Sequence, residues 1–197
     1  HLIRARTVSR FLIFYRSRLW GLIWAYILLI YLSLPLMRWV LKSLRQAMGQ
    51  ELLSLTMTCL LLAAGSALLA YAWHRNRHSL WGLLPLLLVT GAAALSLDRP
   101  EERTHFLQYG LLGILVFATL RCRSLTQVFS MTVFVIAVGC LDELIQWWLP
   151  NRVGDWRDVG MNTLAGALGI AMGAAIFWRS TPAAKLGQCP SSDSSIS

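Results

Sequence analysis

The chain has 197 residues, of which 56% are hydrophobic and only 14% are charged, and its formal net charge is +9. Soluble domains carry about a quarter of charged residues, so this composition argues against a soluble protein and indicates a membrane protein. We expect no nucleic-acid partner, because no soluble basic domain carries the positive charge and anionic lipid beside the loops explains it. The four cysteines show no paired spacing. They therefore predict neither a disulfide framework nor a zinc site.

Residues 1–18 mix arginines with apolar side chains. They form a basic N-terminal arm, which is either an interfacial amphipathic helix or the positive flank of the first span. Six apolar runs follow, each long enough for a helix to cross a hydrocarbon core of about 30 Å. They cover residues 19–36, 52–73, 79–97, 104–120, 128–148 and 159–178. We predict an all-α, polytopic membrane protein, with a helical bundle of about six spans in one domain (19–180) and a disordered polar tail (181–197).

The basic residues are distributed unevenly over the two sides of this bundle. More of them flank the side that carries the N-terminal arm, so the positive-inside rule places both termini in the cytoplasm. We therefore expect a multi-pass protein of the bacterial inner membrane. The first three spans resemble a scaffold, because their few polar residues are Ser and Thr, which in membrane helices usually bond their own backbone.

The polar residues of the second half converge toward the outer side. Glu102, His105 and Tyr109 follow one helix face at spacings of three and four residues. Asp142 and Glu143 each lie three or four residues before Gln146 near the end of the fifth span. The predicted binding or structural cluster comprises Glu102, His105, Tyr109, Asp142, Glu143, Gln146, Arg152, Asp155, Asp158 and Asn162.

A carboxylate inside a membrane helix costs several kcal/mol unless it is neutral or paired. For Glu143 we predict Arg152 as the first partner, since an arginine can reach back from a short loop and bind a carboxylate bidentately. Arg103 and Arg157 are the other candidates. Asp158 is a candidate N-cap of the last helix.

Small residues mark one face of the sixth span. Ala165, Gly169 and Gly173 recur every four residues, and Gly166 lies on the neighbouring ridge with Asn162. Such stripes let helix backbones approach closely in lipid, so we predict a helix-packing role for them.

Two stretches resemble the motifs of the VanZ-like membrane family. "DELIQWWLPNRVGDWRDVGMNTLAGALG" is similar to its second motif and "EERTHFLQYGLLG" to its first, and together they lie within residues 98–170. The chain departs from the family at Glu102, where many relatives carry Lys or Arg three residues before the histidine. The resemblance implies a cell-envelope membrane protein of a family associated with glycopeptide (teicoplanin) resistance, and it implies no reaction.

Three functions remain open. An envelope factor would bind a polar or phosphorylated lipid headgroup at the outer leaflet, with Arg152, Arg157 and Asn162 touching the headgroup while Glu143 and His105 fix their geometry. Alternatively, the chain is an accessory subunit of a larger membrane protein complex, and its cluster only fixes helix packing.

The third possibility is a membrane enzyme acting on lipid-linked substrates, which we favour less than the other two. Its candidate catalytic residues are Glu143 as general base and His105 as acid. Glu102 and His105 have the spacing of half a carboxylate di-metal site, but no second such motif follows. We therefore predict no metal and no other cofactor, and expect membrane lipids as partners.

Overall fold

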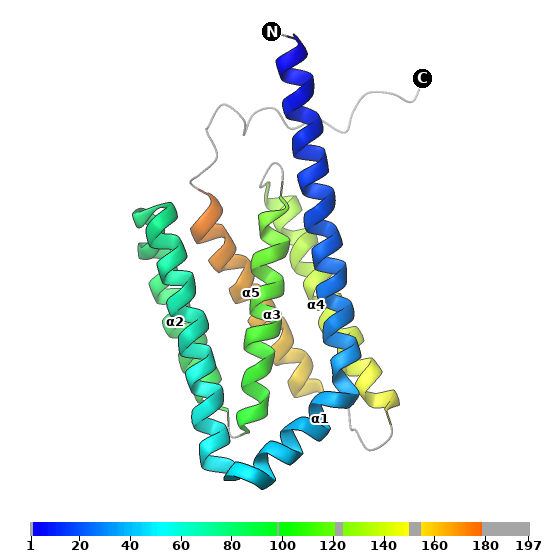
Figure 1. Ribbon diagram of the computed structural model, residues 1–197, viewed down its shortest axis with the longest axis vertical. Helices are drawn as coiled ribbons and strands as arrows, with labels where there is room; N and C mark the ends of the chain where they lie inside the picture. The colour runs from blue at the N-terminus through cyan, green and yellow to red at the C-terminus, as the bar shows by residue number, and fades with distance from the viewer. Residues whose placement is uncertain (1, 98, 121–123, 150–154, 179–197) are drawn as a thin grey trace.

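The computed structural model describes residues 2–97, 99–120, 124–149 and 155–178. Its first element is α1 (Leu2–Arg75), a 74-residue helix interrupted at Gly49, whose φ of 80° lies in the left-handed region that glycine adopts without a Cβ clash. Figure 1 shows α1 descending, turning at the lower end of the molecule and returning upward. The first two predicted spans are thus the two limbs of α1, and residues 2–18 continue its first limb.

Four further helices complete the bundle. They are α2 (Leu80–Leu95), α3 (Arg103–Ala118), α4 (Leu125–Trp148) and α5 (Trp156–Phe177), with short 3-10 turns at Arg77–Ser79 and Pro100–Glu102. Ser124 caps α4 by accepting a hydrogen bond from the backbone N–H of Gln127 at 3.2 Å. Asp155 caps α5 in the same way, accepting from the N–H of Arg157 at 2.9 Å. The predicted cap, Asp158, lies instead in the first turn of α5, because the helix begins earlier than its apolar run.

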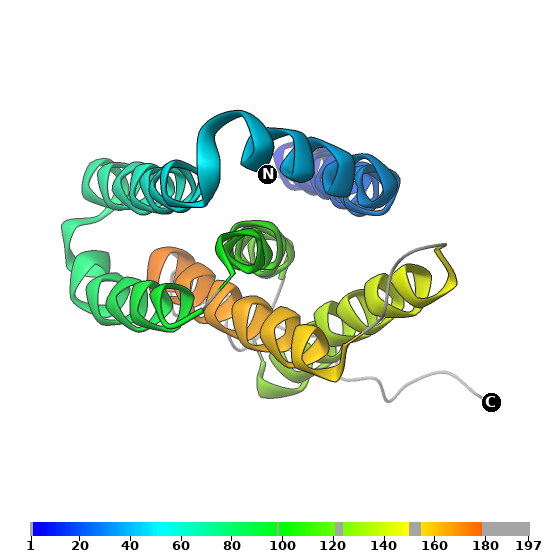
Figure 2. The same ribbon diagram turned by 90° about the horizontal axis from the view of Figure 1, so that it is seen from below.

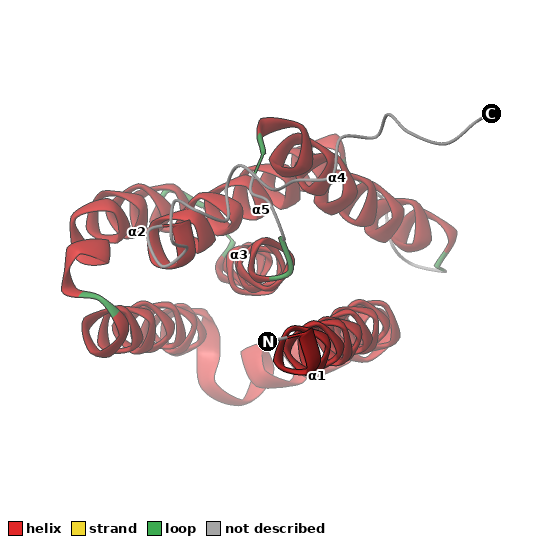
Figure 3. Cartoon of the chain, turned by 90° about the horizontal axis from the view of Figure 1, so that it is seen from above, coloured by secondary structure: helices red, strands yellow, loops and turns green. Residues whose placement is uncertain are grey.

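Helix α3 occupies the centre of the molecule. Figures 2 and 3 show it between the two limbs of α1 on one side and α2, α5 and α4 on the other. Its residues Tyr109, Leu112, Val116 and Phe117 are fully buried. Successive helices run in opposite directions, so the start of α3, the end of α4 and the start of α5 meet at the lower end in Figure 1, beside the turn of α1.

Glycines allow α3 and α5 to touch through their backbones. A Cβ at Gly169 would collide with the backbone of Gly110, and one at Gly113 would lie 2.7 Å from the backbone nitrogen of Ile170. A Cβ at Gly173 would lie 2.8 Å from the Cβ of Phe117, and one at Gly166 would collide with Val135 of α4. Ala165, the remaining member of the predicted stripe, is buried in the same core.

The described part of the chain contains helices and no strand, which confirms the predicted all-α membrane bundle. Five helical segments are long and apolar enough to cross a membrane. The fourth predicted span corresponds to α3, which has 16 residues and is not one of the five. At 1.5 Å per residue it rises only about 24 Å, and its neighbours enclose it. The predicted tail (181–197) lies outside the described residues.

Candidate functional site

Glu143 is the centre of a buried polar cluster between α4 and α5. Its Oε1 accepts hydrogen bonds from the side-chain amides of Gln146, at 3.2 Å, and Asn162, at 3.4 Å. All three side chains are buried, and Asn162 has no exposed surface. A carboxylate in such a site is held by the amide donors around it, because a buried polar group is costly unless it is hydrogen-bonded. The predicted partner Arg152 lies outside the described residues.

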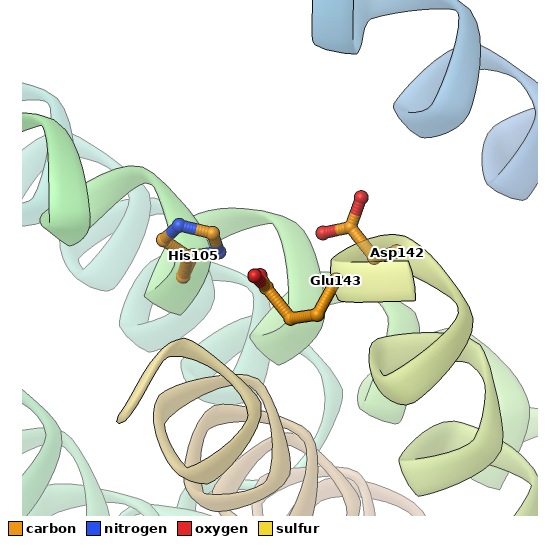
Figure 4. A group of neighbouring side chains, drawn as sticks. All are labelled: His105, Asp142 and Glu143. Carbon is orange, nitrogen blue, oxygen red and sulfur yellow. The ribbon is translucent and has the colours of Figure 1, made fainter. Parts of the chain in front are cut away.

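Asp142 and His105 complete the cluster from α4 and α3. Figure 4 shows Glu143 and His105 pointing toward one another, with Asp142 beside them. One ligating atom from each of the three residues lies within 4.8 Å of the others. Asp142 is 1% exposed and interacts electrostatically with the hydroxyls of Tyr31 and Tyr109.

Two tyrosines support the cluster from its surroundings. The Tyr109 ring stacks on the His105 imidazole, with centroids 6.4 Å apart and planes at 17°. The Tyr31 hydroxyl donates to the backbone oxygen of Val138 at 2.9 Å, which ties α1 to α4 one turn before Asp142. The cluster is therefore built from side chains of α3, α4 and α5, and α1 is hydrogen-bonded to α4 next to it.

Glu102 and Arg157 form a separate ion pair at the edge of the cluster. The Arg157 Nη2 lies 3.4 Å from Glu102 Oε2, and the two side chains are 48% and 8% exposed. Burial raises the pKa of the Glu102 carboxyl above its ordinary range, and the Arg157 guanidinium opposes that shift. Arg157 thus pairs with Glu102 and offsets part of its burial, at the position where the chain departs from the family motif.

Arg103, another predicted partner of Glu143, is buried elsewhere. Its Nη1 donates to Ser54 Oγ at 2.8 Å, to Thr58 Oγ1 at 2.9 Å and to the Ser54 backbone oxygen at 3.2 Å. Its Nε donates to the backbone oxygen of Ala94 at 3.2 Å. The arginine therefore joins the second limb of α1, the end of α2 and the start of α3. Arg103 was one of three candidate partners of Glu143, and the structure instead directs its guanidinium to Ser54, Thr58 and Ala94.

A polar cavity of about 490 Å³ opens beside the cluster. His105, Gln146, Glu102 and Asp158 line it from α3, α4, the turn before α3 and α5. Its remaining lining residues are Ser33, Leu34, Met37, Leu41, Lys42, Arg45, Arg99, Thr104 and Gln108. Among them, Lys42, Arg45 and Arg99 are exposed cations, and they outnumber the two lining carboxylates, Glu102 and Asp158. We call these three cations the basic rim.

Sequence reasoning missed these three cations as site residues. Lys42 and Arg45 are three residues apart and therefore share a helix face. This spacing is the feature of the sequence that could have identified them as neighbours in one site. Their helix was expected to end before them, in a loop between two spans, whereas α1 continues past them to Gly49. Only the turn at Gly49 and the placement of α3 bring this face to the motif residues.

A second cavity, of about 630 Å³, lies between the second limb of α1, α2, α3 and α5. Its lining is mostly apolar and rich in leucine, for example Leu61, Leu87 and Leu111. Gln108 lines both this apolar cavity and the polar one. Both cavities therefore reach the same residue of α3.

These features define a class: a multi-pass helical membrane protein whose polar residues gather at one end of the bundle around a cavity. The chain belongs to the VanZ/LLP1 family, whose model matches residues 19–178. This match confirms the resemblance drawn from the two motifs and extends it over the first three spans. No curated protein and no solved structure matches the chain.

Proposed function

We propose that this VanZ/LLP1 protein binds an anionic, phosphorylated lipid headgroup in the polar cavity. The observation that carries the proposal is the basic rim formed by Lys42, Arg45 and Arg99 at the end of an apolar bundle. Lysine and arginine are the usual partners of phosphate oxygens, and basic pockets between membrane helices bind anionic headgroups. Asn162, expected to touch the headgroup, is reassigned to the buried cluster because it has no exposed surface.

The apolar cavity supports a lipid rather than a soluble anion. It adjoins the polar cavity at Gln108 and offers an aliphatic surface to a hydrocarbon chain. A lipid placed with its headgroup at Lys42 and Arg99 would have its chain directed toward Leu61 and Leu111, within the bundle. A free phosphate would use only the first of these two spaces.

The proposal includes a location and a phenotype. The positive-inside rule favours cytoplasmic termini in a bacterial inner membrane, which puts the cavity at the outer leaflet. There it would meet lipid-linked envelope components, and we extend the proposal to the glycopeptide-resistance association that the family resemblance implies.

The test compares two double variants with equal loss of charge. Lys42→Gln/Arg99→Gln removes two of the three rim cations, and Arg75→Gln/Arg77→Gln removes two exposed charges at and just after the end of α1, at the upper end of the bundle in Figure 1. Each basic residue near an anionic headgroup contributes about 1 kcal/mol, so we expect the rim variant to bind short-chain phosphatidylglycerol about 30-fold more weakly in detergent. The control variant should bind within about threefold of wild type.

Phosphatidylcholine and inorganic phosphate serve as further probes. Wild-type protein should bind phosphatidylglycerol more tightly than either, because only that lipid offers both an anionic headgroup and a chain. Equal weakening in the two double variants, or no preference for phosphatidylglycerol, contradicts the proposal.

A further inference from the structure

We propose that His105, Asp142 and Glu143 form a binding site for one divalent transition-metal ion beside the polar cavity, which His105 lines. One ligating atom of each residue lies within 4.8 Å of the others. The set combines an imidazole from α3 with two carboxylates from α4, and Figure 4 shows the three side chains gathered between these helices. The site goes beyond lipid binding and does not depend on it.

The ligand chemistry selects the ion. Imidazole nitrogen suits Zn²⁺ and its neighbours in the first row, and carboxylate oxygen is a ligand that these ions share. Calcium needs six to eight oxygens, which this set does not supply. Two carboxylates also match the charge of a divalent cation. Bonds of about 2.0 to 2.2 Å place two ligands roughly 3 to 4.4 Å apart, so small side-chain rotations would close the set around Zn²⁺.

The surroundings resemble the supporting shell of a metal site. Gln146 and Asn162 both donate to Oε1 of Glu143, which orients this carboxylate. Outer hydrogen bonds of this kind position the ligands of metal sites. Tyr109 stacks on the His105 ring and adjoins Asp142, so one buried side chain supports two of the three ligands.

A second observation points to a ligand at the same place. Nδ1 of His105 is buried and has no hydrogen-bond partner among the described residues. Buried polar atoms without a partner are uncommon in native structures and need an explanation, such as an ion. His105 also lines the polar cavity, as does Gln146, so an ion held here would have an open side toward the cavity. An open coordination position of that kind is what distinguishes a reactive or ligand-binding zinc site from a structural one.

Glu102 does not belong to this set. The sequence suggested Glu102 and His105 as half of a di-metal motif, yet Glu102 forms its ion pair with Arg157. The structure replaces that pairing by His105 with the two acids of α4. The earlier expectation of no metal followed from searching for a repeat of one local motif, whereas these ligands come from two helices.

The experiment titrates the purified full chain in detergent, stripped with a chelator and free of added lipid, with Zn²⁺ in a calorimeter. We expect about one ion per chain, with His105→Gln, Asp142→Asn and Glu143→Gln each weakening binding at least about 100-fold, more than the loss of an outer-shell partner. Gln146→Leu removes an orienting donor and should weaken binding about 10- to 100-fold. Ca²⁺ should bind far more weakly than Zn²⁺.

Glu51→Gln is the matched control, since it removes one exposed carboxylate of α1 outside the cluster. It should bind Zn²⁺ as wild type does. Circular dichroism and gel filtration identify the variants that fold. If a variant does not fold, the stoichiometry of Zn²⁺ binding by the wild-type protein still tests the proposal. Absence of a one-to-one ion in wild type, or equal binding by the three ligand variants and Glu51→Gln, overturns the proposal. Because the titration contains no added lipid, its result does not depend on whether the protein binds a lipid headgroup.

Discussion

Two polar side chains, one buried and one half-buried, lie at the same end of the bundle, and their surroundings differ. Arg103 is enclosed, since its guanidinium donates to Ser54, Thr58 and the backbone of Ala94. His105, only two residues later, lies on the wall of a cavity, near Asp142 and Glu143. A polar side chain that is enclosed by its hydrogen-bond partners acts as a structural tie, whereas one beside a cavity leaves room for a ligand. The space next to the side chain is what distinguishes the two cases.

The largest effect on stability should come from breaking the Arg103 tie. Arg103→Met removes four hydrogen bonds that a charged donor makes between three helical segments. A hydrogen bond of a charged group contributes about 1.5 to 3 kcal/mol, and part of this is offset because the variant no longer buries a charge. We expect the free energy of unfolding in detergent to fall by about 3 kcal/mol. Thermal or denaturant unfolding measures it.

Arg157→Met is the control for this change, because its ion pair with Glu102 is half-exposed at the arginine. It should lower stability by less than about 1 kcal/mol. If the folded Arg103→Met protein also loses Zn²⁺ binding, the tie and the site are not separate, and the comparison fails.

A smaller effect is expected at the contact between α4 and α5. A Cβ at Gly139 would lie 2.9 Å from the Cβ of Asn162 and 3.6 Å from Tyr109 Cε1. Gly139→Ala should therefore displace Asn162 from Glu143 and lower stability by about 1 to 3 kcal/mol. Gly21→Ala, where a Cβ meets nothing within 4 Å, should leave stability unchanged or raised by under about 1 kcal/mol. Similar unfolding curves for both alanine variants would count against a tightly packed cluster.

The smallest effect concerns the pH dependence of Glu102. Burial raises the pKa of this carboxyl in the folded state, so the folded protein holds the proton more tightly than the unfolded chain does. Stability contributed by this group is present below its ordinary pKa and is lost as the pH rises through the raised value. Glu102→Gln should flatten the fall in stability above about pH 4.5, and Arg157→Gln should steepen it. If the unfolding midpoints of the wild type, Glu102→Gln and Arg157→Gln depend on pH in the same way, this prediction is wrong.

Much of the second half could be predicted from the printed residues. Spacings of three and four placed Glu102, His105 and Tyr109 on one face and Glu143 near Gln146, because those distances follow from the helix alone. The alternating direction of successive spans also predicted that the start of α3, the end of α4 and the start of α5 lie at the same end of the bundle. The partners of the arginines were beyond such reasoning, since Arg103 binds Ser54 across 49 positions of the chain.

The sequence by itself determined the class of protein, the helices and the end of the bundle at which the polar residues gather. Run length, charge and helical spacing are local properties, and the membrane leaves few folds for such a chain. Only the tertiary structure decided that Lys42, Arg45 and Arg99 line a cavity, that Arg157 pairs with Glu102, and that His105 meets the acids of α4. These contacts depend on the turn at Gly49 and on the close approach of α3 and α5, where small differences in helix placement choose one neighbour over another.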